Sequence, residues 1–183
     1  ERIVITGDNG SGKSTFLKTL IGEQKQIEGQ TYIGNGIKIG YISQDTKEQN
    51  NESIEEYVKN SLKNQKIDDS SIIYTVLNQF NFDYEERKKK YSILSPGERT
   101  RLKLAIFSLE DINTLILDEP TNHLDIEALE AIEEVLKDFN GTVIAISHDR
   151  QFIKNIYPNK ILEFTKGKIQ EIYHREDNDY DFR

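Results

Sequence analysis

The pattern of apolar positions along the chain alternates between short strands and helices, which predicts an α/β fold. Two continuous apolar runs, Thr114–Leu117 and Thr142–Ile146, are typical of parallel strands that are covered on both faces. Between them, apolar residues recur at helical spacing from Ile126 to Leu136. This is the crossover helix that a parallel strand pair requires, so we expect a mostly parallel core sheet.

The two ends of the chain carry further strand patterns. Arg2–Thr6 is a short β-branched strand that leads into a glycine-rich turn and a helix from about Gly12 to Ile21. Gln30–Ile33 and Lys38–Ile42 flank a Gly-Asn-Gly turn and predict a β-hairpin in the N-terminal region. A second hairpin is expected at the C-terminal end, where strands 161–164 and 168–173 flank another turn.

The middle of the chain is helical in pattern. Helical spacing runs from about Ser53 to Lys90, and a further helix follows the sequence LSPGE at 94–98. The apolar stripe of that last helix consists of Leu102, Ala105, Ile106 and Leu109. We therefore expect a helical subdomain at about 45–108, inserted into the α/β core.

Length and composition limit the class of protein. A chain of 183 residues has the length of one domain, and none of its apolar runs approaches the ~18–20 residues that span a bilayer. The absence of cysteine excludes disulfides and thiolate metal sites and agrees with a cytoplasmic location. A net charge of −8 argues against a free-standing nucleic-acid-binding domain.

Positive charge is nevertheless concentrated around the LSPGE segment. The basic cluster consists of Arg87, Lys88, Lys89, Lys90, Arg99, Arg101 and Lys103. It is either a solvated helix face, which is the more common origin of such a run, or a surface for an anionic partner.

The glycine-rich turn has the spacing of a phosphate-binding loop, Gly7-x4-Gly12-Lys13-Ser14, between a strand and a helix. Backbone N–H groups and the helix N-terminus point positive dipoles at bound phosphates. Lys13 is expected to pair with the β- and γ-phosphates of ATP, and the Ser14 hydroxyl to ligate Mg²⁺. The predicted nucleotide-binding residues are Gly7, Asp8, Asn9, Gly10, Ser11, Gly12, Lys13, Ser14 and Thr15.

Two carboxylates follow the first buried strand. Asp118 ends the apolar run and Glu119 comes next, at the sheet edge where open α/β sheets bind ligands. We expect Asp118 to hold Mg²⁺ through water and Glu119 to orient and polarise the attacking water, which predicts an ATPase.

Six motifs occur in one order along the chain, and together they resemble the nucleotide-binding domain of the ABC ATPase superfamily. Their sequences are GDNGSGKST at 7–15, Gln44, LSPGE at 94–98, LILDEP at 115–120, TNHLD at 121–125 and SHD at 147–149. The continuous DEPTNHLD and the later SHDRQF resemble the ABC-F subfamily in particular. That resemblance implies a protein with two ABC domains that acts on the ribosome, as a translation factor or in antibiotic resistance.

The resemblance also implies roles for individual residues. Gln44 would contact Mg²⁺ or the attacking water, and His148 would contact the γ-phosphate. The signature residues Ser95, Pro96, Gly97 and Glu98 would cover the ATP of a second ABC domain, so that two domains close head to tail. That second domain would belong either to the same chain or to a homodimer contact. Pro96 stands where the family usually has glycine, and it either suits the first helical turn or weakens the phosphate contact.

By the same resemblance, we expect residues 1–183 to form a single ABC domain that lacks an upstream strand region, and the short insert indicates the second domain of an ABC-F protein. Two alternatives remain: the ATPase subunit of a membrane transporter, and a non-catalytic scaffold gated by ATP.

Overall fold

A computed structural model describes residues 1–43, 50–65, 67, 70–122, 124–165 and 168–174, which divide into two compact units. The first unit consists of Glu1–Gln44, Ile112–Asn122 and Phe139–Arg183, and the second of Asp45–Asp111 and His123–Asp138. The sheet belongs to the first unit and most of the helices to the second. The inserted helical region expected at about 45–108 falls within the second unit, which also contains the helix after Asp125.

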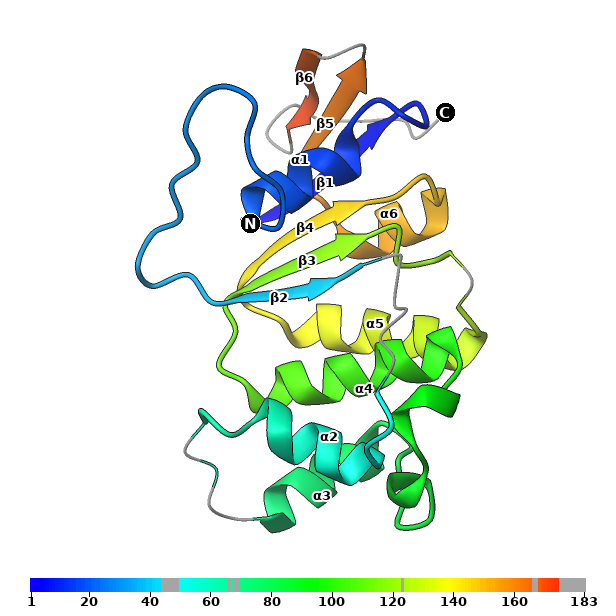
Figure 1. Cartoon of the computed structure of the whole chain (residues 1–183). Helices are drawn as coiled ribbons and strands as arrows, with labels where there is room; N and C mark the ends of the chain where they lie inside the picture. The colour runs from blue at the N-terminus through cyan, green and yellow to red at the C-terminus, as the bar shows by residue number, and fades with distance from the viewer. Residues whose placement is uncertain (44–49, 66, 68–69, 123, 166–167, 175–183) are drawn as a thin grey trace. The chain divides into compact units, whose positions relative to one another are not determined.

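The first unit is built on a sheet with the strand order β2-β3-β4-β1-β5-β6, which can be followed in Figure 1. The strands are β1 (Arg2–Gly7), β2 (Ile39–Ile42), β3 (Thr114–Asp118), β4 (Thr142–Ile146), β5 (Lys160–Thr165) and β6 (Lys168–His174). All neighbouring pairs are parallel except β5 and β6, which form the antiparallel C-terminal hairpin. The mostly parallel α/β sheet expected from the apolar runs is thus confirmed.

Both faces of the central strands are buried. Helix α1 (Lys13–Leu20) places Leu17 against Ile5, Ile116 and Ile146 on one face of the sheet. The alternate positions on these strands point to the other face. Several of them are completely buried as well: Val4, Leu115, Leu117, Val143 and Ala145. Burial on both faces explains why these strands are continuous apolar runs and not alternating ones.

The N-terminal hairpin predicted at 30–33 and 38–42 is wrong. Only its second half forms a strand, and β2 pairs in parallel with β3, with Ile39 opposite Thr114. The Asn113 side chain holds the preceding segment, because its Nδ2 donates to the Gly36 carbonyl at 2.6 Å and its Oδ1 accepts from the Lys38 N–H at 3.0 Å. The segment before β2 is therefore held by Asn113, which is distant in sequence, and not by the neighbouring strand that the turn had suggested.

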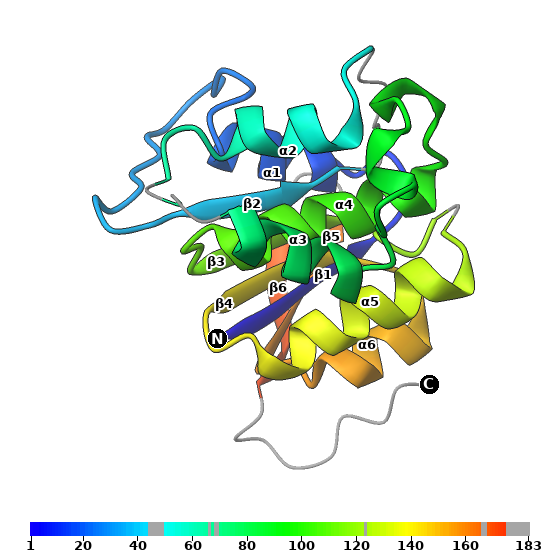
Figure 2. The same cartoon turned by 90° about the horizontal axis from the view of Figure 1, so that it is seen from below.

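The second unit contains α2 (Ile54–Ser61), α3 (Ser70–Gln79), α4 (Pro96–Leu109), α5 (Ile126–Asp138) and two short 3₁₀ turns, η1 (Glu86–Lys88) and η2 (Tyr91–Ile93). Helices α4 and α5 lie side by side, as Figures 1 and 2 both show. The apolar stripe predicted for α4 is confirmed, with Leu102, Ala105 and Ile106 buried and Leu109 packed at the edge of the core.

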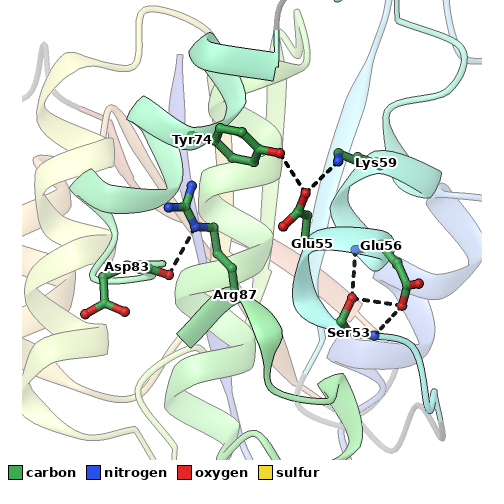
Figure 3. Close-up of polar contacts among 7 residues, drawn as sticks. All are labelled: Ser53, Glu55, Glu56, Lys59, Tyr74, Asp83 and Arg87. Atoms are coloured by element: carbon green, nitrogen blue, oxygen red, sulfur yellow. Dashed lines mark hydrogen bonds and ion pairs between the residues drawn. The ribbon is translucent and has the colours of Figure 1, made fainter. Parts of the chain in front are cut away.

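Polar contacts fix the start of α2 and its packing on the neighbouring helix. Ser53 and Glu56 form a reciprocal capping box at the helix start. The Glu55 carboxylate accepts hydrogen bonds from Lys59 Nζ and from the Tyr74 hydroxyl on α3, both at 2.6 Å (Figure 3). These donors lower the pKa of Glu55, with the Lys59 hydrogen bond as the largest cause.

Candidate nucleotide-binding site

The loop between β1 and α1 has a backbone that only glycine adopts easily. Gly7, Gly10 and Gly12 have φ values of 130°, 78° and 101°. A Cβ on Gly7 would also collide with the Phe164 carbonyl oxygen, which belongs to the neighbouring strand β5. The glycine spacing seen in the sequence therefore has two physical causes here: positive φ angles at the three glycines, and the close approach of strands β1 and β5 at Gly7.

Helix α1 begins without a side-chain cap. Its N-cap is Gly12, so within the described part of the chain no side chain caps the first backbone N–H groups, and its first turn contains no acidic residue. The start of α1 therefore combines free donors with the positive end of the helix dipole, which suits an anion. Ser11 Oγ, just before this turn, is buried and has no hydrogen-bond partner among the described residues.

The Lys13 side chain lies in the loop itself. It is only 6% exposed, and its ammonium donates to the carbonyls of Gly7 at 2.6 Å and Asp8 at 3.0 Å. The loop backbone thus holds this cation beside the uncapped helix start. Lysine and helix dipole together provide the positive charge that a polyphosphate requires.

Asp118 closes β3 beside Ser14. The Ser14 hydroxyl donates to Asp118 Oδ1 at 3.0 Å, across 104 positions of sequence, and Asp118 is 2% exposed. Its second oxygen, Oδ2, accepts from the Tyr41 hydroxyl at 3.3 Å. Burial, followed by the charge of Asp118, raises the pKa of Tyr41. The hydroxyl and the carboxylate are hard oxygen ligands of the kind that Mg²⁺ prefers, and their adjacency fits a magnesium site.

Glu119 is the next residue and has a left-handed backbone, with φ at 50°. Its N–H donates to the Ile146 carbonyl of β4 at 3.0 Å, and its Oε1 lies 3.3 Å from His148 Nε2, just beyond the end of β4. A non-glycine residue with positive φ is strained and persists where the surrounding structure holds it in place. Glu119 and His148, predicted separately from two motifs, are thus brought together.

A cavity of about 400 Å³ joins these groups. It is lined by Asn9, Gly10, Gly12, Lys13, Ser14, Thr15, Glu119 and Asn122. Most of the predicted loop residues border this cavity. Gly7 and Asp8 do not line it, but their carbonyls accept hydrogen bonds from Lys13. Asn122 is an addition that the sequence reasoning did not assign. Its place three residues after Glu119 in the sequence could have suggested it. In the structure, the Asn122 N–H donates to the Glu119 carbonyl at 3.2 Å.

The signature residues lie in the other compact unit. Ser95 caps α4, Pro96 occupies the first helical turn and Gly97 is buried. Glu98 completes a capping box, since its Oε2 accepts from the Ser95 N–H at 2.7 Å while Ser95 Oγ accepts from the Glu98 N–H at 3.2 Å. Proline is well suited to this first turn, where its missing N–H would be unpaired in any case. Gln44, predicted to contact Mg²⁺ and water, lies outside the described residues.

Most side chains of the basic cluster contact residues within the second unit. Arg87 is 7% exposed and stacks over the Tyr74 ring at 4.5 Å, while its Nε donates to the Asp83 carbonyl (Figure 3). Arg101 pairs with Glu127 of α5 at 2.7 Å. Lys88 and Lys89 pair with Glu85 and Glu86. Arg99 donates to the Ser92 carbonyl at 3.1 Å. At least five of the seven charges therefore have intramolecular partners, which favours the structural alternative over a surface for an anionic partner.

The chain belongs to the ABC transporter family, since the sequence profile of that family matches residues 1–122. The match covers the phosphate loop, the signature and the acidic pair, and it ends before His148. Together with the cavity beside the phosphate loop, the family match identifies the chain as an ATP-binding domain of the ABC ATPase type.

Its relatives point to the F subfamily. The chain is 37% identical to "ABC transporter F family member 2" of Arabidopsis thaliana, over 93% of this chain and 25% of that protein. It is 32% identical to "Ribosome protection protein VmlR" of Bacillus subtilis, over 91% of this chain and 30% of that protein. The chain thus spans only about a quarter to a third of the length of these two relatives.

A dimeric, post-hydrolysis structure of an ATP-binding cassette bound to ADP and Pi has the same fold. It superposes with a TM-score of 0.76 at 23% identity, over 94% of this chain and 86% of that one. Among the described residues of this chain, no helix is long and apolar enough to cross a membrane.

Proposed function

We propose that this chain binds and hydrolyses MgATP as one of two ABC domains in an ABC-F protein that acts on the ribosome in the cytoplasm. The observation that carries the proposal is the cavity of about 400 Å³, whose lining combines Lys13 and Ser14 at the uncapped start of α1 with the carboxylate of Glu119. Hydrogen-bond donors and a carboxylate therefore border the same space, as phosphoryl transfer to water requires.

The phosphates of ATP would bind against the first turn of α1. Lys13 would then exchange the carbonyls of Gly7 and Asp8 for phosphate oxygens, which form stronger, charge-assisted hydrogen bonds. Ser14 and Asp118 would hold Mg²⁺, which neutralises phosphate charge and polarises the terminal phosphoryl group when bound.

Glu119 is the proposed general base for the attacking water. It lines the cavity, and its side chain is 13% exposed, so that little bulk water competes for its carboxylate. His148, 3.3 Å away, would fix the orientation of this carboxylate and contact the γ-phosphate. Asn122 borders the same space and offers an amide for positioning water.

The ATP bound by this chain would be covered by the signature of another ABC domain. In return, Ser95–Glu98 of this chain would cover the ATP of that domain. Closure around two nucleotides would couple ATP binding to a large change of shape, and hydrolysis would reverse it. Support for the ribosome as the target comes from the similarity to a ribosome protection protein and to F-family members. The short insert between Gln44 and Leu94 favours the second domain of such a protein.

The test uses the full-length protein with Glu119→Gln, which keeps the shape of the side chain but removes the base. This variant is expected to bind ATP, stall before hydrolysis and sediment with ribosomes in ATP but not in ADP. Binding should weaken at high salt, because contacts with rRNA phosphates release counterions. Glu130→Gln, at an exposed position of α5, is the matched control and should turn over ATP like the wild type.

Two outcomes would contradict this proposal. Sedimentation of the Glu119→Gln protein with membranes and not with ribosomes would favour the ATPase subunit of a transporter, in line with the name of the matching family. Equal ATP turnover in the wild type and in Glu119→Gln would remove Glu119 from catalysis and favour a scaffold gated by ATP.

A further inference from the structure

We propose that Tyr41 is a positioning residue for the magnesium site, acting through Asp118. Tyr41 lies on β2, three residues before Gln44, and none of the motifs discussed above includes it. Its hydroxyl donates to Asp118 Oδ2 at 3.3 Å. The inference rests on the proposed function, because it concerns how one of the residues assigned to Mg²⁺ is held.

The two oxygens of Asp118 have different donors. Oδ1 accepts from Ser14, which is itself a proposed metal ligand, while Oδ2 accepts from Tyr41, which is not. If Ser14 turned its oxygen toward a bound metal, its hydrogen bond to Asp118 would change. The Tyr41 bond does not involve a proposed ligand other than Asp118, so it could hold the carboxylate plane with and without the metal. Hydrogen bonds of this kind orient ligands around metals.

The ring of Tyr41 is well fixed for this purpose. It packs against the core cluster that contains Leu17 and Ile116, and the β2–β3 register places Tyr41 directly opposite Ile116, two residues before Asp118. The phenol therefore reaches along the edge of the sheet toward the carboxylate from a strand that is hydrogen-bonded to β3 over its whole length. A rigid strand gives a more exact orientation than a loop would.

The experiment compares the full-length protein with its Tyr41→Phe variant, which loses only the hydroxyl. Binding of a fluorescent ATP analogue is measured in EDTA and during a Mg²⁺ titration, and Mn²⁺ binding is followed by electron paramagnetic resonance. Loss of an outer hydrogen bond to a metal ligand typically weakens metal binding ~10- to 100-fold. We expect the Mg²⁺ midpoint and the Mn²⁺ dissociation constant to rise about 10-fold, while affinity in EDTA and the melting temperature stay unchanged.

Tyr74→Phe is the matched control. It removes a comparable hydroxyl–carboxylate bond, Tyr74 to Glu55 at 2.6 Å, from the other compact unit (Figure 3), and it should leave the Mg²⁺ midpoint where it is in the wild type. A double variant gives the second check. If Tyr41 acts through Asp118, Tyr41→Phe should have no further effect on the Mg²⁺ midpoint once Asp118→Asn is present.

The outcomes separate this inference from the proposed function. A wild-type protein whose nucleotide binding ignores Mg²⁺ would overturn the magnesium site and the inference together. If the wild type responds to Mg²⁺ and the Tyr41→Phe variant has the same Mg²⁺ midpoint, the inference fails while the proposed function stands. Equal losses of affinity in EDTA and in Mg²⁺ would also reject the inference, because Tyr41 would then support the whole cavity and not the metal ligand.

Discussion

Two helices of this chain begin at motifs that are both expected to contact ATP, yet their first turns are built differently. Helix α1 starts at Gly12 with no side-chain cap and no acidic residue in its first turn. Helix α4 starts at Ser95 with a complete capping box, in which Glu98 returns a carboxylate to the same helix end. The first helix leaves its donors for a ligand, whereas the second satisfies part of its own.

The difference shows that a helix N-terminus is not equally ready for phosphate wherever it occurs. At α1, the dipole and Lys13 both favour negative charge. At α4, the Ser95 hydroxyl accepts from the Glu98 N–H and keeps only its own O–H to donate, and the Glu98 carboxylate already occupies part of the positive end. A site of the α4 kind is therefore expected to bind phosphate weakly alone and to depend on a second domain that already holds the ATP.

The largest expected effect comes from removing the cation at α1. Lys13→Ala should weaken ATP binding about 100-fold, because charged hydrogen bonds to buried groups contribute ~1.5–3 kcal/mol each. Fluorescence titration with an ATP analogue measures the change. Lys18→Ala, in the last turn of the same helix, is the control and should bind ATP normally. Unchanged affinity in Lys13→Ala would count against the phosphate loop and with it the contrast between the two helices.

The second effect concerns glycine at the two helix starts. A Cβ on Gly97 would lie 2.5–2.9 Å from the Asp125 carboxylate atoms, so Gly97→Ala should destabilise the fold by about 1–3 kcal/mol through overpacking. A Cβ on Gly12 meets nothing within 4 Å, so the cost of Gly12→Ala comes from its φ of 101°, ~1–2 kcal/mol. Denaturant unfolding measures both.

Asp125→Ala distinguishes these two origins. In combination with Gly97→Ala it should recover part of the loss, although alone it removes the cap that Asp125 provides to the Ala128 N–H of α5. In combination with Gly12→Ala the two losses should simply add. Additive losses in both pairs would show that Asp125 does not set the requirement for glycine at Gly97.

The smallest effect separates charge from capping at α4. Glu98→Gln keeps the reciprocal hydrogen bond to Ser95 but removes the negative charge, a change of about 0.3–1 kcal/mol near a helix N-terminus. Stability should fall slightly, and the ATP concentration needed for domain closure should decrease a few-fold because repulsion of the partner's phosphates is relieved. Ser95→Ala, which loses the cap, should lower stability by ~1 kcal/mol without strengthening closure. Crosslinking across ATP concentrations would test this, and a higher ATP requirement in Glu98→Gln would contradict it.

Much of the fold followed from local pattern. The buried strands β3 and β4, the crossover helix α5 and the C-terminal hairpin were all predicted. Helix α6 (Arg150–Ile156) was missed, although Asp149 as a cap and the buried Phe152, Ile153 and Ile156 carry its signal. The N-terminal hairpin failed because a Gly-Asn-Gly turn indicates a reversal of the chain but not which strand follows.

Features that neighbouring residues build are encoded locally: the phosphate loop with its glycines, the uncapped start of α1, and the capping boxes of α2 and α4. The meeting of side chains from distant segments was fixed only by the folded arrangement of the strands. That arrangement placed Ser14 and Tyr41 on the two oxygens of Asp118, His148 beside Glu119, and Asn113 where a partner strand had been expected. The physical reason is that a loop or a cap is fixed by backbone angles over a few residues. A contact across 77 or 104 residues depends instead on the order and register of strands, which no short pattern contains.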